Sequence, residues 1–370
     1  MRSRKEQGMS LVELVVGIAV LSFFSVGIGI FLRNQSVSFL KQQRKTEVQS
    51  ELRELLSRIN KLAVASSEVA VGGNLNLQIK SVQSGLCAEV DSLAPNNLLD
   101  GTNLFQWACG GAPAQTWRLQ FVYSYADSRG GYQFIARHSN KCIDVAGVGT
   151  NSGANVQQWS CLGEKQLNQV WKVESPGTGI SGYLLKPQHA PTQCLDLDGG
   201  GMTNGINIQQ WACNNGARQR WSIVNSNRPG FSPDLNLSGI NPKTYSEIDF
   251  AQRDKNQNYR NTYFVSQCVP RPAGLPSLPT PQDCMSCPED QMPVVTDGLG
   301  NRVFPIGNGL SSNGSFAASL CITEDYNVPS LAMRVTAYAR ETDGSVVAYQ
   351  LTGTVPRAPS GNKRNQLLGN

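Results

Sequence analysis

Tryptophan and planar polar side chains recur together in the middle of this chain, and their chemistry suits non-covalent binding. All six tryptophans lie between Trp107 and Trp221, and aspartate, asparagine and glutamine residues accompany them. An indole face attracts weakly positive C–H groups, and planar carboxylate and amide groups hydrogen-bond hydroxyls. These residue types therefore favour non-covalent binding of C–H faces and hydroxyl groups over covalent chemistry.

Groups that could perform catalysis are sparse by comparison. The only histidines, His138 and His189, have no nucleophile nearby in the sequence. Asp196 and Asp198 are close together, but alternate residues of any strand share a face. Because no pattern combines a nucleophile, a base and oxyanion donors, we expect no enzyme activity. The sequence also indicates no cofactor and no metal.

The tryptophans fall into three successive segments that share one pattern. Each segment has two cysteines and two tryptophans, and the closing tryptophans recur roughly every 50 residues, at Trp117, Trp171 and Trp221. Such a repeat predicts three copies of one unit, each too small to bury its own apolar face. We therefore expect the three copies to form one domain over residues 74–227.

The ten cysteines all follow residue 86, and their number indicates an oxidising compartment. Their spacing predicts one disulfide in each repeat: Cys87–Cys109, Cys142–Cys161 and Cys194–Cys213. Four others remain, at Cys268, Cys284, Cys287 and Cys321. A four-cysteine zinc site is conceivable, but for an exported protein we favour two further disulfides, whose pairing the sequence leaves open.

The N-terminus combines a short basic leader with a long apolar run. From Met9 to Leu32 the only charged side chain is Glu13, and the run is long enough to cross a bilayer as a helix. An ordinary signal anchor is also apolar, but a carboxylate inside such a span is costly and indicates a function. The segment resembles the start of type IV prepilins and of type II secretion pseudopilins, and most closely that of large minor pilins.

This resemblance implies roles for three residues. A prepilin peptidase would cut after Gly8, removing residues 1–8, and would methylate the new N-terminal residue, Met9. Glu13, the fifth mature residue, would pair with the N-terminal ammonium of a neighbouring pilin subunit during assembly. The helix would hold the protein in the inner membrane with a periplasmic head, before the protein joins a pilus at the cell surface.

The helix is expected to continue beyond the membrane and to cover residues 9–72. An apolar stripe at helical spacing follows the membrane segment: Val48, Leu52, Leu55, Ile59 and Leu62. A coiled coil is an alternative, but the stripe covers only about two heptads. We therefore expect it to pack against the protein's own β-sheet, and we expect Gly72-Gly73 to end the helix.

The three repeats resemble the ricin-type lectin domain, which is a β-trefoil. Its signature is Gln-x-Trp near the end of each repeat, found here at Gln115–Trp117, Gln169–Trp171 and Gln219–Trp221. The resemblance implies that these closing tryptophans share one hydrophobic core. It also implies that the earlier ones, Trp107, Trp159 and Trp211, stand where a tryptophan stacks on a sugar ring.

The second repeat has every group that the resemblance implies for a sugar site. Asp144 and Asn168 would bond adjacent sugar hydroxyls while Trp159 stacks on the ring. Gln157 would reach a further hydroxyl, and Gln169 would orient Asp144. The ligand implied is a carbohydrate, with galactose-like sugars as candidates.

The other two repeats depart from this pattern. The third keeps four of the five groups: Asp196, Gln209, Trp211 and Gln219. Its asparagine is replaced by Arg218, which can only donate hydrogen bonds, so we expect a preference for an acidic sugar or a weaker site. The first repeat changes three positions, to Glu89, Phe105 and Ala114, and we expect it to be structural.

After the repeats we expect a pilin-like, β-rich region over residues 228–355 and a flexible tail over 356–370. Alternating residues and a turn at Asp343-Gly344 predict a hairpin from Leu331 to Val355. The fold class expected is mainly β with one long N-terminal helix. It would be a pilin-like α+β scaffold, with the trefoil inserted between the helix and the C-terminal sheet.

Two functions are consistent with these features. The net charge is only +5 and no basic cluster is present, so nucleic acid is not an expected partner. We expect a minor type IV pilin whose trefoil binds carbohydrate, for adhesion to or recognition of glycan-bearing surfaces. The alternative is a structural minor pilin or type II secretion pseudopilin that primes filament assembly, with a trefoil that contacts proteins and binds no sugar.

Overall fold

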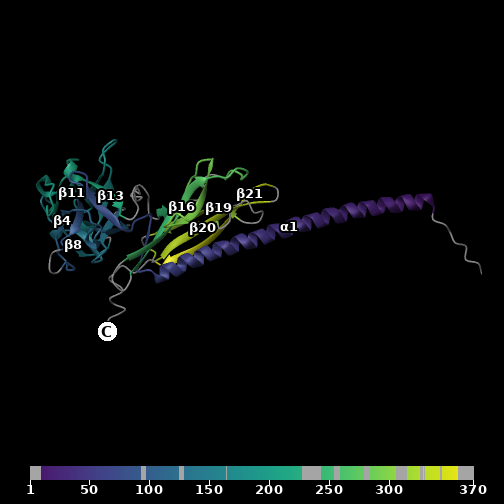
Figure 1. Ribbon diagram of the computed structural model, residues 1–370, viewed down its shortest axis with the longest axis horizontal. Coiled ribbons are helices and arrows are strands. Elements are labelled where there is room, and N and C mark those ends of the chain that lie inside the picture. The colour runs from purple at the N-terminus through teal and green to yellow at the C-terminus, as the bar shows by residue number, and fades with distance from the viewer. Residues whose placement is uncertain are drawn as a thin grey trace, which may run out of the picture.

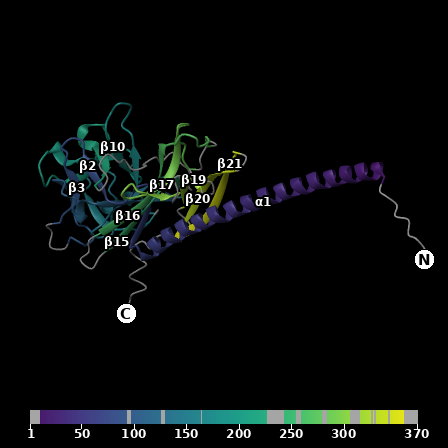
Figure 2. The same ribbon diagram turned by 45° about the vertical axis from the view of Figure 1, so that its right-hand side comes forward.

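The computed structural model of the protein has a long helix, a β-rich head beside the second half of that helix, and a separate β domain formed by the repeats (Figure 1). The described residues are 10–92, 97–124, 129–163, 165–226, 243–253, 259–278, 284–305, 315–325, 328, 330–341 and 344–356. In both views the repeat domain and the N-terminal end of the helix lie at opposite ends of the molecule (Figure 2).

The helix α1, Leu11–Ala65, has an exposed first half and a second half that is buried on one face. Ser10 caps its start, because the Ser10 hydroxyl accepts hydrogen bonds from the amides of Val12 and Glu13. The predicted apolar stripe is buried at Val48, Leu52, Leu55 and Ile59 and partly buried at Leu62. It packs against the strands of the head, which confirms the prediction of packing on the protein's own sheet.

The end of the helix differs from the prediction, which placed it at Gly72-Gly73. The helix ends at Ala65, where the Ser66 hydroxyl donates to the carbonyl of Leu62 at 2.6 Å. Residues 68–71 form strand β1, Glu68–Val71, because pairing with another strand of the head competes with continued helix. Gly72 lies in the turn after β1, with φ at 65°. A Cβ atom at this position would lie 2.7 Å from the Tyr245 ring, so the turn requires glycine.

Two antiparallel sheets build the head. The first has the order β1-β15-β16-β17-β18 and the second the order β14-β19-β20-β21. Their bounds are β14 Lys243–Tyr245, β15 Glu247–Arg253, β16 Tyr259–Pro270, β17 Gln291–Asp297, β18 Arg302–Phe304, β19 Ser315–Glu324, β20 Ser330–Arg340 and β21 Val346–Pro356. Strands β20 and β21 pair with Leu331 opposite Val355, so the predicted hairpin is confirmed.

Helix α1 and both sheets share one hydrophobic core. Leu52 and Ile59 of the helix, Phe264 of β16 and Val335 of β20 are fully buried in it. The four cysteines left open by the sequence form two disulfides, Cys268–Cys287 and Cys284–Cys321. These bonds join the 284–287 segment to β16 and β19, so no thiolate of this group is available to zinc.

The repeat domain is a barrel covered by three hairpins, which is the β-trefoil expected. The barrel closes through the pairs β2–β5, β5–β6, β6–β9, β9–β10, β10–β13 and β13–β2, and the hairpins are β3–β4, β7–β8 and β11–β12. The strands are β2 Leu77–Ser81, β3 Cys87–Val90, β4 Leu104–Trp107, β5 Trp117–Ser124, β6 Arg129–Ala136, β7 Lys141–Val145, β8 Val156–Ser160, β9 Trp171–Glu174, β10 Tyr183–Pro187, β11 Gln193–Leu197, β12 Ile208–Ala212 and β13 Arg220–Asn225. The closing tryptophans Trp117, Trp171 and Trp221 are buried together in its core, as expected.

Three asparagines at equivalent positions of the repeats meet in a closed ring. Asn103 donates to Asn207 at 2.9 Å, Asn207 to Asn155 at 3.1 Å, and Asn155 to Asn103 at 2.8 Å. Each side chain gives one hydrogen bond and accepts one, so every member depends on both others. The ring links the three repeats to one another through side-chain hydrogen bonds.

A buried ion pair links the trefoil to the head. Arg137 of the trefoil, 1% exposed, forms an ion pair with Glu68 of β1, with Nη2 and Oε2 2.9 Å apart. The chain enters through Gly73 and leaves near Ser226, and these ends lie together because Asn225 Nδ2 donates to the Gly73 carbonyl at 3.4 Å. A buried ion pair therefore joins the trefoil to the head beside the point where the chain enters it.

Candidate functional site

The hairpin β7–β8 of the second repeat brings three of the predicted site residues onto one face. Asp144 lies opposite Gln157, and Cys142 lies opposite Trp159. Because alternate residues of a strand point the same way, Asp144, Gln157 and Trp159 share one side of the hairpin. The Cys142–Cys161 disulfide closes the open end of the hairpin, beside the tryptophan.

Asp144 is held by three amide side chains. Its Oδ2 accepts hydrogen bonds from Asn168 Nδ2 at 2.8 Å and from Gln169 Nε2 at 3.0 Å, and its Oδ1 accepts one from Gln157 Nε2 at 3.2 Å. The short helix η3, Leu167–Gln169, supplies the first two. A carboxylate can accept about four hydrogen bonds, so Oδ1 retains capacity for one more donor, such as a ligand hydroxyl.

The two amides from η3 are themselves held by further hydrogen bonds, most of them to the backbone. Gln169 Nε2 also donates to the carbonyl of Ser160 at 3.0 Å, and its Oε1 accepts from the amide of Leu162 at 2.9 Å. Asn168 Nδ2 also donates to the carbonyl of Val145 at 2.9 Å, and its Oδ1 accepts from Gln166 at 2.8 Å. Gln169 is thus placed to orient Asp144, while the oxygen of Asn168 has one protein partner and a second lone pair to offer a ligand.

Trp159 differs sharply from the core tryptophan of the same repeat. Its side chain is 39% exposed, whereas Trp171 is 1% exposed. A loop of the first repeat borders the ring, and a Cβ atom at Gly101 would lie 3.9 Å from it. The exposed indole can therefore offer a face to a ligand, and the neighbouring loop supplies one wall beside it.

The electrostatics of Asp144 follow from its burial. Burial raises the pKa of Asp144 above its ordinary value of 3.8, although hydrogen bonds from Gln169, Gln157 and Asn168 act in the opposite direction. Burial also raises the pKa of Asp196, the equivalent residue of the third repeat. A raised pKa means that each carboxylate takes up its proton at a higher pH than an ordinary aspartate.

Any ligand that bonds the Asp144 carboxylate is expected to bind less tightly in mild acid. The ionised carboxylate accepts hydrogen bonds with both oxygens, and protonation turns one of them into a donor. Because the pKa is raised above 3.8, affinity should begin to fall at a higher pH than for an ordinary aspartate. Titration calorimetry between roughly pH 7 and 4 measures this. An affinity that stays constant over this range would contradict the expectation, and Asp144→Asn serves as the control without a titrating group.

The third repeat brings its five predicted residues together but arranges them differently. Arg218 replaces the asparagine and forms an ion pair with Asp196, with Nε and Oδ2 3.1 Å apart. Gln219 Nε2 donates to the same oxygen at 2.9 Å, and Gln209 Nε2 lies 3.4 Å from Oδ1. Trp211 is 39% exposed. The charge of Arg218 is thus largely offset by a fully buried carboxylate, which leaves less of it for an acidic ligand.

The first repeat uses its acidic group internally. Glu89 accepts hydrogen bonds from Gln115 at 2.6 Å and from Ser92 at 2.5 Å. Phe105, in the position of the rim glutamine, is 8% exposed and its ring centre lies 5.6 Å from that of Trp107. The carboxylate of this hairpin is therefore bonded within the protein, and an apolar ring stands in place of the rim glutamine. The structural role expected of this repeat stays a prediction.

Three glutamines that the sequence analysis did not single out position the loops beside the earlier tryptophan of each repeat. Gln158 Nε2 donates to the carbonyls of Asn97 at 2.7 Å and Leu99 at 2.9 Å, which belong to the neighbouring repeat. Gln106 and Gln210 bond equivalent loops. The available signal was a glutamine directly before each of these tryptophans, in all three repeats.

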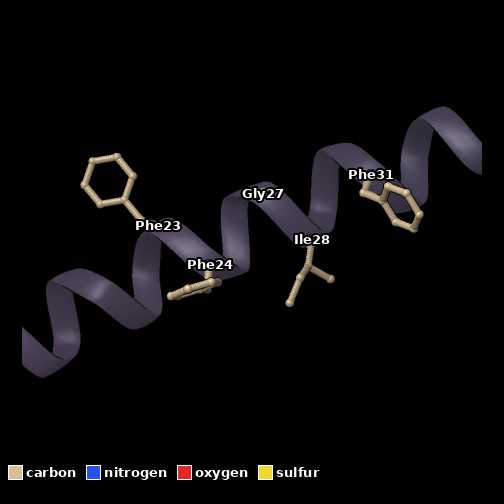
Figure 3. Close-up of a pocket in the computed structure, with 5 residues that line it drawn as sticks. All are labelled: Phe23, Phe24, Gly27, Ile28 and Phe31. Atoms are coloured by element: carbon tan, nitrogen blue, oxygen red, sulfur yellow. The ribbon is translucent and has the colours of Figure 1, made fainter.

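The N-terminal segment presents an apolar surface. Gly8 and Met9 lie outside the described residues. Glu13 is exposed, and its Oε2 accepts a hydrogen bond from the Ser10 amide at 2.9 Å. The helix is long and apolar enough to cross a membrane, and none of that stretch is buried. Figure 3 shows the side chains of Phe23, Phe24, Ile28 and Phe31 projecting from it around Gly27.

Comparisons with known protein families match two segments of the chain. Residues 3–29 match the family described as the prokaryotic N-terminal methylation motif. Residues 68–159, 120–211 and 167–232 match the ricin-type beta-trefoil lectin domain-like family. The chain is therefore a pilin-like protein with a lectin-like domain, and it carries a prepilin-type methylation motif ahead of a ricin-type β-trefoil. No curated protein sequence matches it.

Several solved structures are similar to about two fifths of this chain. A designed threefold-symmetric protein, ThreeFoil, is 31% identical with a TM-score of 0.35, and the match covers 40% of this chain and 96% of that one. The Rhizoctonia solani agglutinin is 16% identical, with a TM-score of 0.33 and coverage of 41% and 96%. The C-half of an earthworm R-type lectin, solved with GalNAc, is 16% identical, with a TM-score of 0.28 and coverage of 40% and 97%.

Proposed function

We propose that this protein is a minor type IV pilin whose trefoil binds carbohydrate, for adhesion to or recognition of glycan-bearing surfaces. One observation carries the proposal: in the second repeat an exposed tryptophan, Trp159, stands beside a buried carboxylate, Asp144, that three amides hold in place. An aromatic face with a planar acceptor beside it matches the C–H face and hydroxyls of a pyranose. A galactose-like sugar with adjacent hydroxyls is the ligand we assign, and we assign no catalytic role.

The rest of the proposal concerns processing and location. A prepilin peptidase cuts after Gly8 and methylates Met9, and the exposed apolar helix then holds the protein in the inner membrane with its head in the periplasm. Glu13 pairs with the N-terminus of a neighbouring pilin subunit during assembly into a pilus. The methylation motif and the exposed charged residue within the apolar segment support this route.

Display on a filament also suits the modest affinity expected of a single site. A few net hydrogen bonds at about 1 kcal/mol each, with one stacking contact, correspond to roughly millimolar affinity. Several weak sites engaged at once bind far more tightly than one. A filament that presents several trefoils supplies that multivalency.

A glycan array probed with the full chain in detergent tests the proposal. The expected result is binding to galactose-containing glycans, reduced about tenfold by Trp159→Ala through the loss of stacking. Trp211→Ala, the same change in the third repeat, is the matched control and should have the smaller effect. A folded chain that binds no glycan would favour the alternative, a minor pilin or pseudopilin that primes filament assembly and whose trefoil contacts only proteins.

A further inference from the structure

The second repeat differs from the others in a set of exposed apolar side chains around its candidate sugar site. Leu98 is 55% exposed, Leu99 58% and Leu162 53%, and together with Trp159 they form what we call the apolar rim. Exposed leucines occur singly on many proteins. Here three of them accompany an exposed tryptophan. Two directly precede residues that bond β8, and the third lies just after the end of β8.

Hydrogen bonds place the rim on the two sides of Trp159. The loop carrying Leu98 and Leu99 runs along β8, because the Gly101 amide donates to the Gln158 carbonyl at 2.9 Å and the Ser160 amide donates to Asp100 Oδ1 at 2.7 Å. Leu162 follows the end of β8, and its amide donates to Gln169, which orients Asp144. The backbone of both rim segments is therefore held beside β8 and, through Gln169, beside the polar groups of the site.

The third repeat has the same backbone arrangement without the leucines. Its flanking loop makes the equivalent bonds, from the Gly153 amide to the Gln210 carbonyl at 2.8 Å and from the Ala212 amide to Ser152 Oγ at 2.9 Å. The residues equivalent to the three leucines are Thr150, Asn151 and Asn214. Because the fold accepts polar side chains at all three positions, the backbone does not require leucine there.

The polar side chains within the rim have partners of their own. Asp100, between Leu99 and Gly101, accepts hydrogen bonds from Lys141 Nζ at 2.5 Å and from the hydroxyl of Ser160 at 3.0 Å. These bonds direct the Asp100 carboxylate toward β8. The three exposed leucines therefore offer apolar side chains beside polar groups that already have partners, and they suit a group that avoids water.

Resting on the proposed sugar site, we propose that the second repeat recognises a galactoside whose aglycone is apolar, with the sugar on Asp144 and Trp159 and the aglycone on Leu98, Leu99 and Leu162. Contact with the rim removes apolar surface of both partners from water. The third repeat lacks this surface and does not distinguish such a ligand from the free sugar.

Titration calorimetry with the full chain held in amphipol tests this with two probes, methyl and n-butyl galactoside, each in both anomers. We expect one n-butyl anomer to bind about tenfold more tightly than its methyl counterpart, a difference of about 1.4 kcal/mol. The triple variant Leu98→Thr, Leu99→Asn, Leu162→Asn, which carries the third-repeat residues, should bind both probes with the affinity of the methyl glycoside.

The controls separate the rim from the sugar site and from the amphipol. Met202→Thr, at a loop position 62% exposed beside the first repeat, should leave the preference for n-butyl galactoside unchanged. Partition of n-butyl galactoside into amphipol is the same for every variant. Equal affinities for the two probes in the wild-type chain would overturn the apolar rim alone. Failure of both probes to bind would instead contradict the proposed galactose site.

Discussion

Replacing Asp144 with alanine is expected to weaken galactoside binding by about a hundredfold or more while the trefoil stays folded. A hydrogen bond to a charged group contributes about 1.5–3 kcal/mol, so losing the carboxylate removes the largest polar contribution of the site. The change also releases Gln157, Asn168 and Gln169, whose amides all point at this carboxylate. Titration calorimetry with methyl galactoside gives the affinity, and thermal unfolding reports on the fold.

The third repeat supplies the matched control. Asp196 occupies the equivalent position, and Asp196→Ala removes a carboxylate bonded to Gln219 and Arg218. We expect galactoside affinity within about twofold of the wild type, because the second site is intact. Equal losses in both variants would mean that the two sites contribute alike, and unchanged binding in Asp144→Ala would remove Asp144 from the site.

The second large effect is expected at the junction between the trefoil and the head. Glu68→Gln takes the charge from a buried pair whose side chains are 10% and 1% exposed, and it should lower the free energy of unfolding by about 3 kcal/mol. The physical reason is that Arg137 keeps its charge in a place where water cannot solvate it. Denaturant unfolding of the full chain in detergent measures the loss.

Two variants test whether burial is the cause. Glu174 forms ion pairs with Lys172 and Lys186 at the surface of the trefoil, and Glu174→Gln should cost less than about 1 kcal/mol. Adding Arg137→Met to Glu68→Gln removes the buried charge and should recover part of the stability. A Glu68→Gln variant as stable as Glu174→Gln would show that the junction does not depend on this pair.

Much of the fold was predictable because its signals are repeated or periodic. Two tryptophans and two cysteines per repeat indicated three copies of one unit, and the Gln-x-Trp resemblance implied a trefoil. The structure has the closing tryptophans in one core and the three disulfides within the repeats. The stripe from Val48 to Leu62 indicated the buried face of the helix. Each of these patterns is local, so no knowledge of distant partners was needed to interpret it.

What the sequence did not reveal depends on contacts between distant segments. The helix was expected to reach Gly72, but residues 68–71 pair with β15, far along the chain, and this pairing decides where the helix ends. The pairing of Cys268 with Cys287 and of Cys284 with Cys321 is set by β16 and β19. The loop that borders Trp159 comes from another repeat, so the rim of the candidate site is not visible within any one repeat.

The path of the chain through β1 and β15 has a consequence for how this protein is organised. These strands are antiparallel neighbours, with Val71 opposite Ile248, and the Gly72 amide donates to the Glu247 carbonyl at 3.1 Å. Between them along the chain lie the trefoil and then β14, which pairs with β19 in the second sheet of the head. The trefoil is thus inserted between two strands of the head, β1 and β14, and every strand of the scaffold lies outside it. Such an architecture permits the displayed module to be exchanged for another while the part that anchors it is left unchanged.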